Sequence, residues 1–114
     1  MNQLNSILIE GNLVRDPEFT TTSKGTSICK FTIASNRYFK QGNEFQQEVS
    51  YFDVVTWSDL AARCSEKLKK GKGVRVIGRL KQERWTDKDG HGKSKVCIVA
   101  NHVEWRVQHD EKVT

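Results

Sequence analysis

The sequence contains few prolines, which interrupt regular structure, and few cysteines, which can cross-link a chain. Only one of its 114 residues is proline and three are cysteine. Cys29, Cys64 and Cys97 are an odd number at wide spacing, so we expect buried free thiols in a reducing cytosol rather than a disulfide framework. No apolar run approaches the ~20 residues that span a bilayer, and the first residues lack the features of a signal peptide. We expect a cytoplasmic protein without membrane contact.

Motifs for catalysis and metal binding are also missing. No Cys or His pair has the spacing of a zinc site, and Gly71, Gly73 and Gly78 match neither a P-loop nor a dinucleotide fingerprint. Asp53 and Asp59 resemble a nuclease metal pair, but one lies on a predicted strand and the other in the first turn of a predicted helix, where Asp is common. We therefore expect no enzyme, no metal and no cofactor.

Positive charge is in excess. Lys and Arg number 19 against 14 Asp and Glu, which gives a formal net charge of +5. The segment 63–84 holds most of this excess, with nine basic residues and two acidic ones. Such a balance favours a polyanionic partner such as nucleic acid. Cations at the end of a helix are ordinary, so the predicted strand residues Arg75 and Arg79 are more informative than the lysines around 67–70.

Alternating hydrophobicity predicts five strands, over residues 6–14, 26–38, 49–57, 73–85 and 93–105. Helical spacing predicts one short helix over Ser58–Lys70, with Ser58 as its N-cap and Gly71 as its C-cap. We expect a flexible loop over Lys40–Glu44 and a hairpin turn over Asp87–Gly90. The inner faces of the strands are predicted to hold Ile7, Ile9, Leu13, Cys29, Phe31, Ile33, Phe52, Val54, Thr56, Val74, Val76 and Leu80.

This order of elements favours an all-β OB-fold, a five-stranded Greek-key barrel with one short helix between strands 3 and 4. An open α+β sheet is the alternative. Gly11, in the middle of the first strand, suits the sharp bend that a small barrel needs at a corner. We expect residues 1–107 to form the OB-fold domain and residues 108–114 a short C-terminal tail.

The same alternation brings aromatic rings and cations to one surface. Tyr51 and Trp57 share a strand face with Asp53, so that face is not the core. On the next strand Trp85 shares a face with Arg79. Unpaired nucleic acid needs both groups, because each base can stack on a ring, worth ~1–3 kcal/mol, and each phosphate attracts a cation. Rings that cap the barrel or lie in a subunit contact are the alternative.

Several motifs, in this order, resemble the bacterial single-stranded DNA-binding protein (SSB) family. They are Ile9-Glu10-Gly11-Asn12-Leu13, Asp16-Pro17-Glu18, Val54-Val55 leading to Leu60-Ala61, Leu68-Lys69-Lys70-Gly71 and Arg84-Trp85-Thr86-Asp87. The similarity covers about residues 5–105. It implies an OB-fold that assembles as a homotetramer through paired dimers and wraps ssDNA without sequence preference in replication, recombination and repair.

The resemblance also implies the residues of the site. The family's base-stacking positions fall on Phe39, Tyr51, Trp57 and Trp85. We expect phosphate contacts from Arg37, Lys40, Lys70, Arg75, Arg79, Lys81 and Arg84. Asp53, Asp59 and Glu83 stand where some members have basic residues, so no phosphate contact is expected from those positions.

Two hypotheses follow from the sequence: non-specific ssDNA binding, and a primosome-type OB-fold adaptor that acts mainly through protein partners. Family members usually end in an acidic tip that recruits replication and repair proteins, whereas this sequence ends Glu111-Lys112-Val113-Thr114. Replication and repair proteins are possible partners, but the acidic tip that recruits them in the family is absent from this sequence. The missing tip and the acidic replacements favour the adaptor modestly, and a nuclease ranks third.

Overall fold

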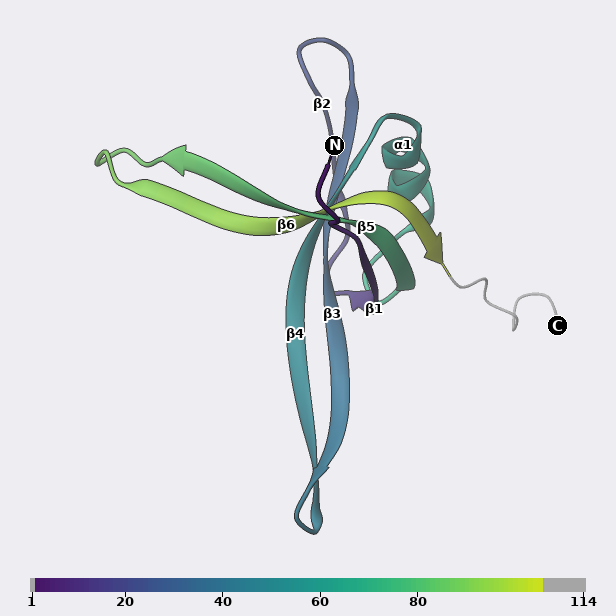
Figure 1. The fold of residues 1–114 in the computed structure, drawn as a ribbon. Helices are drawn as coiled ribbons and strands as arrows, with labels where there is room; N and C mark the ends of the chain where they lie inside the picture. Colours follow the sequence, from purple (N-terminus) through teal and green to yellow (C-terminus); the bar gives the residue numbers. More distant parts are fainter. Residues whose placement is uncertain (1, 106–114) are drawn as a thin grey trace, which may run out of the picture.

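The computed structural model describes residues 2–105, which form a barrel with long hairpins projecting from it (Figure 1). The elements are β1 (Ile7–Leu13), β2 (Glu18–Thr21), β3 (Ser27–Gln41), β4 (Glu44–Trp57), α1 (Ser58–Lys67), β5 (Gly73–Thr86) and β6 (Gly92–Trp105). The predicted domain end at 107 and the tail 108–114 lie outside the described residues. No helix within residues 2–105 is long and apolar enough to cross a membrane.

The strands close into the predicted five-stranded OB-fold. The sheet order is β1-β5-β6-β4-β3-β2, and an additional pairing of β1 with β3 completes the barrel. All neighbours are antiparallel except β4 and β6, which pair in parallel through Val54↔Ile98 and Val55↔Val99. The single described helix, α1, follows the third strand of the closed barrel and precedes the fourth.

The core confirms most of the predicted inner faces. Buried residues of that prediction are Leu13, Cys29, Phe31, Ile33, Val54, Thr56, Val74 and Val76, with Ile7, Ile9 and Phe52 packed against them. Leu80 is the exception, because it is 44% exposed. From Arg79 to Thr86 no residue of β5 is buried, so Leu80 lies where the strand leaves the covered part of the barrel. Ala61 and Cys64 of α1 complete the core from outside the sheet.

The strands around the long hairpins differ from the prediction. The expected loop over Lys40–Glu44 is wrong, since pairing continues to Gln41↔Glu44 and the turn consists of residues 42–43, with Gly42 at φ 65°. Hydrophobic alternation fades here because a ribbon that projects into solvent has no core side. The short strand β2, which pairs with β3, is fully exposed and was not predicted for the same reason.

The helix is shorter than predicted and its caps differ. It ends at Lys67, not Lys70, because Leu68 turns to an extended conformation and buries its side chain. Trp57 occupies the N-cap position, so the prediction of Ser58 as N-cap is wrong, and no side chain caps this end. Gly71 adopts φ 88° but lies beyond the C-cap, and its N–H donates to the Leu13 carbonyl 2.8 Å away.

Gly11 marks the place where two strands approach most closely. A Cβ at this position would lie 2.6 Å from the Ala34 carbonyl oxygen of β3. The β1–β3 pairing that closes the barrel begins next to it, at Asn12↔Ala34. Gly11 therefore lets the backbones meet at the barrel corner, as the sequence predicts.

The three cysteines are free and buried, as expected. Burial raises the pKa of all three thiols, and that of Cys64 to about 11. A thiol at neutral pH therefore stays protonated in these positions and behaves as a small apolar group.

Candidate nucleic-acid interface

Three of the predicted stacking rings are exposed, two on β4 and one on the β5–β6 ribbon. Tyr51 and Trp57 of β4 are 65% and 43% exposed, and Trp85 of β5 is 48% exposed. Tyr51 and Trp57 share one face of β4 because they are separated by an even number of residues. Trp85 is paired across the β5–β6 ribbon with Lys93. The exposure predicted for these rings is confirmed.

Phe39 has a different setting. Ala34 pairs with Tyr51, so Tyr51 shares a face of the β3–β4 ribbon with even-numbered residues of β3, and Phe39 lies on the opposite face. Its ring is half-buried beneath the guanidinium of Arg37, whose Cζ lies 4.7 Å from the ring centroid. Arg37 also approaches Glu48, with 3.9 Å between Nη1 and Oε1. The structure thus brings Arg37 and Phe39 together, away from the Tyr51 face.

The cations of β5 fall into two groups. Arg79 and Lys81 share the outer face of the strand with Trp85, and neither has a carboxylate within ion-pair distance among the described residues. Arg84 lies on the opposite face, where its Nη2 donates to the Gln82 Oε1 at 2.7 Å. Arg79 and Lys81 are therefore the β5 cations best placed to act with a stacked base on Trp85.

Arg75 is already paired with two carboxylates. Its Nη2 lies 2.6 Å from Glu10 Oε2 and its Nε donates to the same oxygen, while Nη1 lies 3.7 Å from Glu104. The hydrogen bond to Glu10 and the charge of Glu10 raise the pKa of Arg75 above its ordinary value. Arg75 is ten residues from Trp85 along β5, which corresponds to about 33 Å of strand.

The remaining predicted phosphate contacts lie apart from these strands. Lys70 is in the turn after α1, where its backbone N–H donates to Asp16 Oδ1 at 2.9 Å. Lys40 lies near the tip of the β3–β4 hairpin, with Nζ 6.0 Å from the centroid of the Phe45 ring. The structure does not gather Lys40, Lys70 and Arg75 around one ring.

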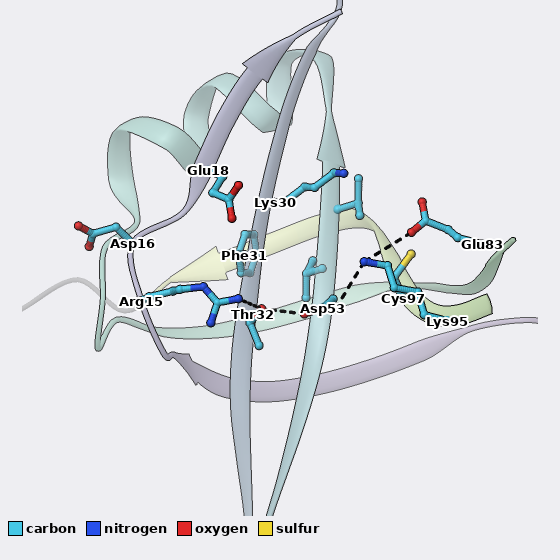
Figure 2. Close-up of a pocket in the computed structure, with 12 residues that line it drawn as sticks. Arg15, Asp16, Glu18, Lys30, Phe31, Thr32, Asp53, Glu83, Lys95 and Cys97 are labelled. Carbon is cyan, nitrogen blue, oxygen red and sulfur yellow. Dashed lines mark hydrogen bonds and ion pairs between the residues drawn. The ribbon is translucent and has the colours of Figure 1, made fainter. Parts of the chain in front are cut away.

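A hollow on the surface is lined by residues of β2, β3, β4, β5 and β6 and of the turn after β1 (Figure 2). Arg15 donates to the Thr32 hydroxyl oxygen at 3.2 Å, and that hydroxyl donates to Asp53 Oδ1 at 2.7 Å. Lys95 Nζ then lies 3.9 Å from Asp53 Oδ2 and 4.0 Å from Glu83 Oε1. The two carboxylates that interrupt the basic surface thus neutralise a lysine within the hollow.

Sequence reasoning missed four residues of this surface, which are Arg15, Lys95, Tyr38 and Phe45. Lys95 could have been found, because alternation over the predicted strand 93–105 places it on the same face as Lys93 and Cys97. Arg15 could not, since it lies in a turn whose path depends on tertiary contacts. Tyr38 and Phe45 are exposed on the hairpin, at the edge of the predicted loop.

One exposed group within residues 2–105 has donor atoms close enough together for a cation: Asp87, Asp89 and His91, in the β5–β6 turn. The Asp87 carboxylate accepts backbone N–H groups of Asp89 and His91, at 2.9 and 2.8 Å. These bonds are what an Asp contributes to a tight turn. The cluster is therefore explained by the turn geometry.

Comparison with known proteins gives a consistent result. The chain matches the Single-strand binding protein family over residues 4–106. It is 40% identical over 104 residues to a single-stranded DNA-binding protein of Treponema pallidum, covering 91% of this chain but only 58% of that protein. A single-stranded DNA-binding protein of Aquifex aeolicus is 43% identical over 101 residues, with 88% of this chain and 68% of the relative covered.

A further relative, single-stranded DNA-binding protein 2 of Chlorobaculum tepidum, is 39% identical over 107 residues, covering 92% of this chain and 72% of its own length. The family match over residues 4–106 includes the barrel, both long hairpins and every described site residue. Together with the OB-fold and its outward rings, they show that the chain belongs to the single-strand binding protein family.

Proposed function

We propose that this protein binds single-stranded DNA without sequence preference. The observation that supports this most directly is the exposure of Tyr51 and Trp57 on one face of β4 and of Trp85 on β5, where Arg79 and Lys81 share the face of Trp85. The exposed part of each ring can stack a base of any identity, because every base has a π-face. The names of the relatives agree with this activity.

In the proposed complex, rings hold bases and cations hold the backbone. Arg79 and Lys81 meet phosphates of a strand that runs from Trp85 along the same face of β5. A base on Phe39 takes the place of the Arg37 guanidinium over that ring. Further phosphate contacts are proposed for Lys40, Lys70 and Arg84. Arg75 contributes only after release from Glu10 and Glu104, so its share is small.

The proposed role is to protect and organise ssDNA during replication, recombination and repair, in the cytoplasm, without catalysis. We further propose a homotetramer built from dimers. From Ile7 to Gly11, β1 pairs with β5 on one side only, because its contact with β3 is limited to Asn12 and Leu13. An open strand edge with Leu8 65% exposed is suited to pairing with a second copy.

Titration with oligo-dT tests the binding. Tryptophan fluorescence should be quenched, since Trp57 and Trp85 are two of the three tryptophans and both are exposed. The logarithm of the affinity should fall with the logarithm of salt concentration, with a slope of ~0.7 per phosphate contacted. Absence of quenching at low salt would refute the proposal. Light scattering tests the assembly, and a monomer at micromolar concentration would contradict the tetramer.

The adaptor hypothesis is the second candidate, and neither the family match nor the names of the relatives favour it. It predicts a tight helicase or primase partner in a pull-down together with weak ssDNA affinity. Incubation of labelled ssDNA with Mg²⁺ or Mn²⁺ separates both candidates from a nuclease, because binding alone leaves the strand at full length.

A further inference from the structure

The far part of the β3–β4 hairpin has two chemically different faces. Residues 36–41 of β3 pair with residues 44–49 of β4 in an unbroken register, from Asn36↔Val49 to Gln41↔Glu44. This ribbon projects away from the barrel, so both of its faces meet solvent (Figure 1). Cross-strand partners share a face, which allows each side chain to be assigned.

We name the face that continues from Tyr51 the tip face. It consists of Asn36, Tyr38, Lys40, Phe45, Gln47 and Val49. The opposite face consists of Arg37, Phe39, Gln41, Glu44, Gln46 and Glu48. Both carboxylates of this part of the hairpin lie on the opposite face, so the tip face has one cation and no acidic group.

The rings of the tip face are among the most exposed in the described chain. Tyr38 is 69% exposed and Phe45 is 80% exposed. Lys40 pairs directly with Phe45 and its Nζ lies 6.0 Å from the ring centroid. An exposed ring keeps its π-face free to stack on a partner. A cation beside an exposed ring, without a competing carboxylate, suits a stacked base with its phosphate.

The rings also form a series that leads to the barrel. Tyr38 pairs with Gln47, two residues from Phe45 along β4, and Tyr51 follows four residues after Gln47. These intervals correspond to about 7 Å and about 13 Å of strand. Asn36, Lys40 and Gln47 lie among the rings, and Val49 is the one aliphatic side chain of the face, so polar groups interrupt its apolar surface. The pattern favours a chain of separate bases over a protein surface.

We propose that the tip face binds a further segment of ssDNA, with bases stacked on Tyr38 and Phe45 and a phosphate at Lys40. This inference rests on the proposed ssDNA binding and extends its path from the barrel along the hairpin. It follows that a long strand uses the tip face, whereas a strand short enough to be held by the barrel alone does not.

The test compares a Tyr38→Ala/Phe45→Ala variant with a Gln41→Ala/Gln46→Ala control that alters the opposite face. Each is titrated with a short and a long oligo-dT, following tryptophan quenching, and its mass is measured by light scattering. We expect wild-type affinity of both proteins for the short strand. For the long strand, the ring variant should bind at least about fivefold more weakly, the effect of losing one stacked base, while the control should be unchanged.

A Phe45→Trp variant gives an independent readout, because its new fluorophore should be quenched by long oligo-dT and not by short. Equal long-strand affinity of the ring variant and the control would overturn the inference, even where wild-type binding establishes the proposed function. A loss of mass in the ring variant that accounts for its weaker binding would assign the face to contact between copies, and would also overturn it. No binding of either strand by the wild type would refute the proposed function itself.

Discussion

Lys95 is held by two carboxylates in the hollow, and removing those charges should strengthen ssDNA binding. The perturbation is Asp53→Asn with Glu83→Gln. Asn keeps a carbonyl oxygen that can accept the Thr32 hydroxyl, whose bond to Asp53 is 2.7 Å long, so the fold should be preserved. The substitution leaves Lys95 with no partner of opposite charge at 3.9 or 4.0 Å.

The magnitude follows from the exposure of these groups. The side chains of Lys95 and Asp53 are about half exposed, so solvent screens the pair, and such pairs are worth about 0.2–1 kcal/mol each. In the wild type, both ion pairs must break before Lys95 can bind a phosphate, which costs up to about 2 kcal/mol. Removing the two carboxylates should therefore raise the affinity for ssDNA by about 2-fold to 30-fold at low salt. One added phosphate contact should steepen the salt dependence by ~0.7.

The assay is an oligo-dT titration of the variant at several salt concentrations. A matched control, Asp59→Asn with Glu66→Gln, changes the net charge equally through two residues of α1 that do not line the hollow. We expect the control to keep the wild-type slope. If the variant and the control gain affinity equally, without a steeper slope, the effect is one of overall charge and the hollow is not on the DNA path.

Three further predictions concern single residues. Arg75→Ala should weaken ssDNA binding less than Arg79→Ala does, because Arg75 is neutralised by ion pairs. Arg79→Ala should also lower the salt slope by ~0.7. Equal losses of affinity in oligo-dT titrations of the two variants would contradict this ranking. Gly11→Ala should destabilise the fold by about 1–3 kcal/mol in urea unfolding, because the new Cβ would lie 2.6 Å from the Ala34 carbonyl oxygen. An unchanged urea midpoint would show that β1 can shift freely. Stability should fall as pH rises from about 9 to about 11, by up to about 2 kcal/mol, because the folded state raises the pKa of Cys64 from 9.0 to about 11 and the unfolded state releases its proton first. The loss should be smaller in Cys64→Ala, measured against its own neutral-pH stability, and an equal loss in that variant would contradict this.

The barrel could be predicted from the sequence because its strands have one covered side. Burial of Cys29, Phe31 and Ile33 on one face of β3 imposes the alternation that a pattern search detects. The same logic failed for the outer part of β3 and β4, where both sides meet solvent. At Leu80 it failed for the same cause, since alternation continues into the part of β5 where no residue is buried.

The site shows a similar division. Exposure of Tyr51 and Trp57 follows from strand parity, because Asp53 between them identifies the outer face. The ion-pair partners of charged residues cannot be predicted from strand parity, since the Arg75–Glu10 pair joins strands that are distant in sequence. Phe39 was placed through the family resemblance, and only the register shows that it lies on the other face of the ribbon.

The affinity of Trp85→Ala for oligo-dT tests the central claim, that bases stack on the outward rings. Trp85 is half exposed and uncharged, so its loss should remove stacking without removing a phosphate contact. We expect binding about 5-fold to 150-fold weaker than wild type, which corresponds to ~1–3 kcal/mol for one stacked base, with an unchanged salt slope. Wild-type affinity in this variant would contradict the account.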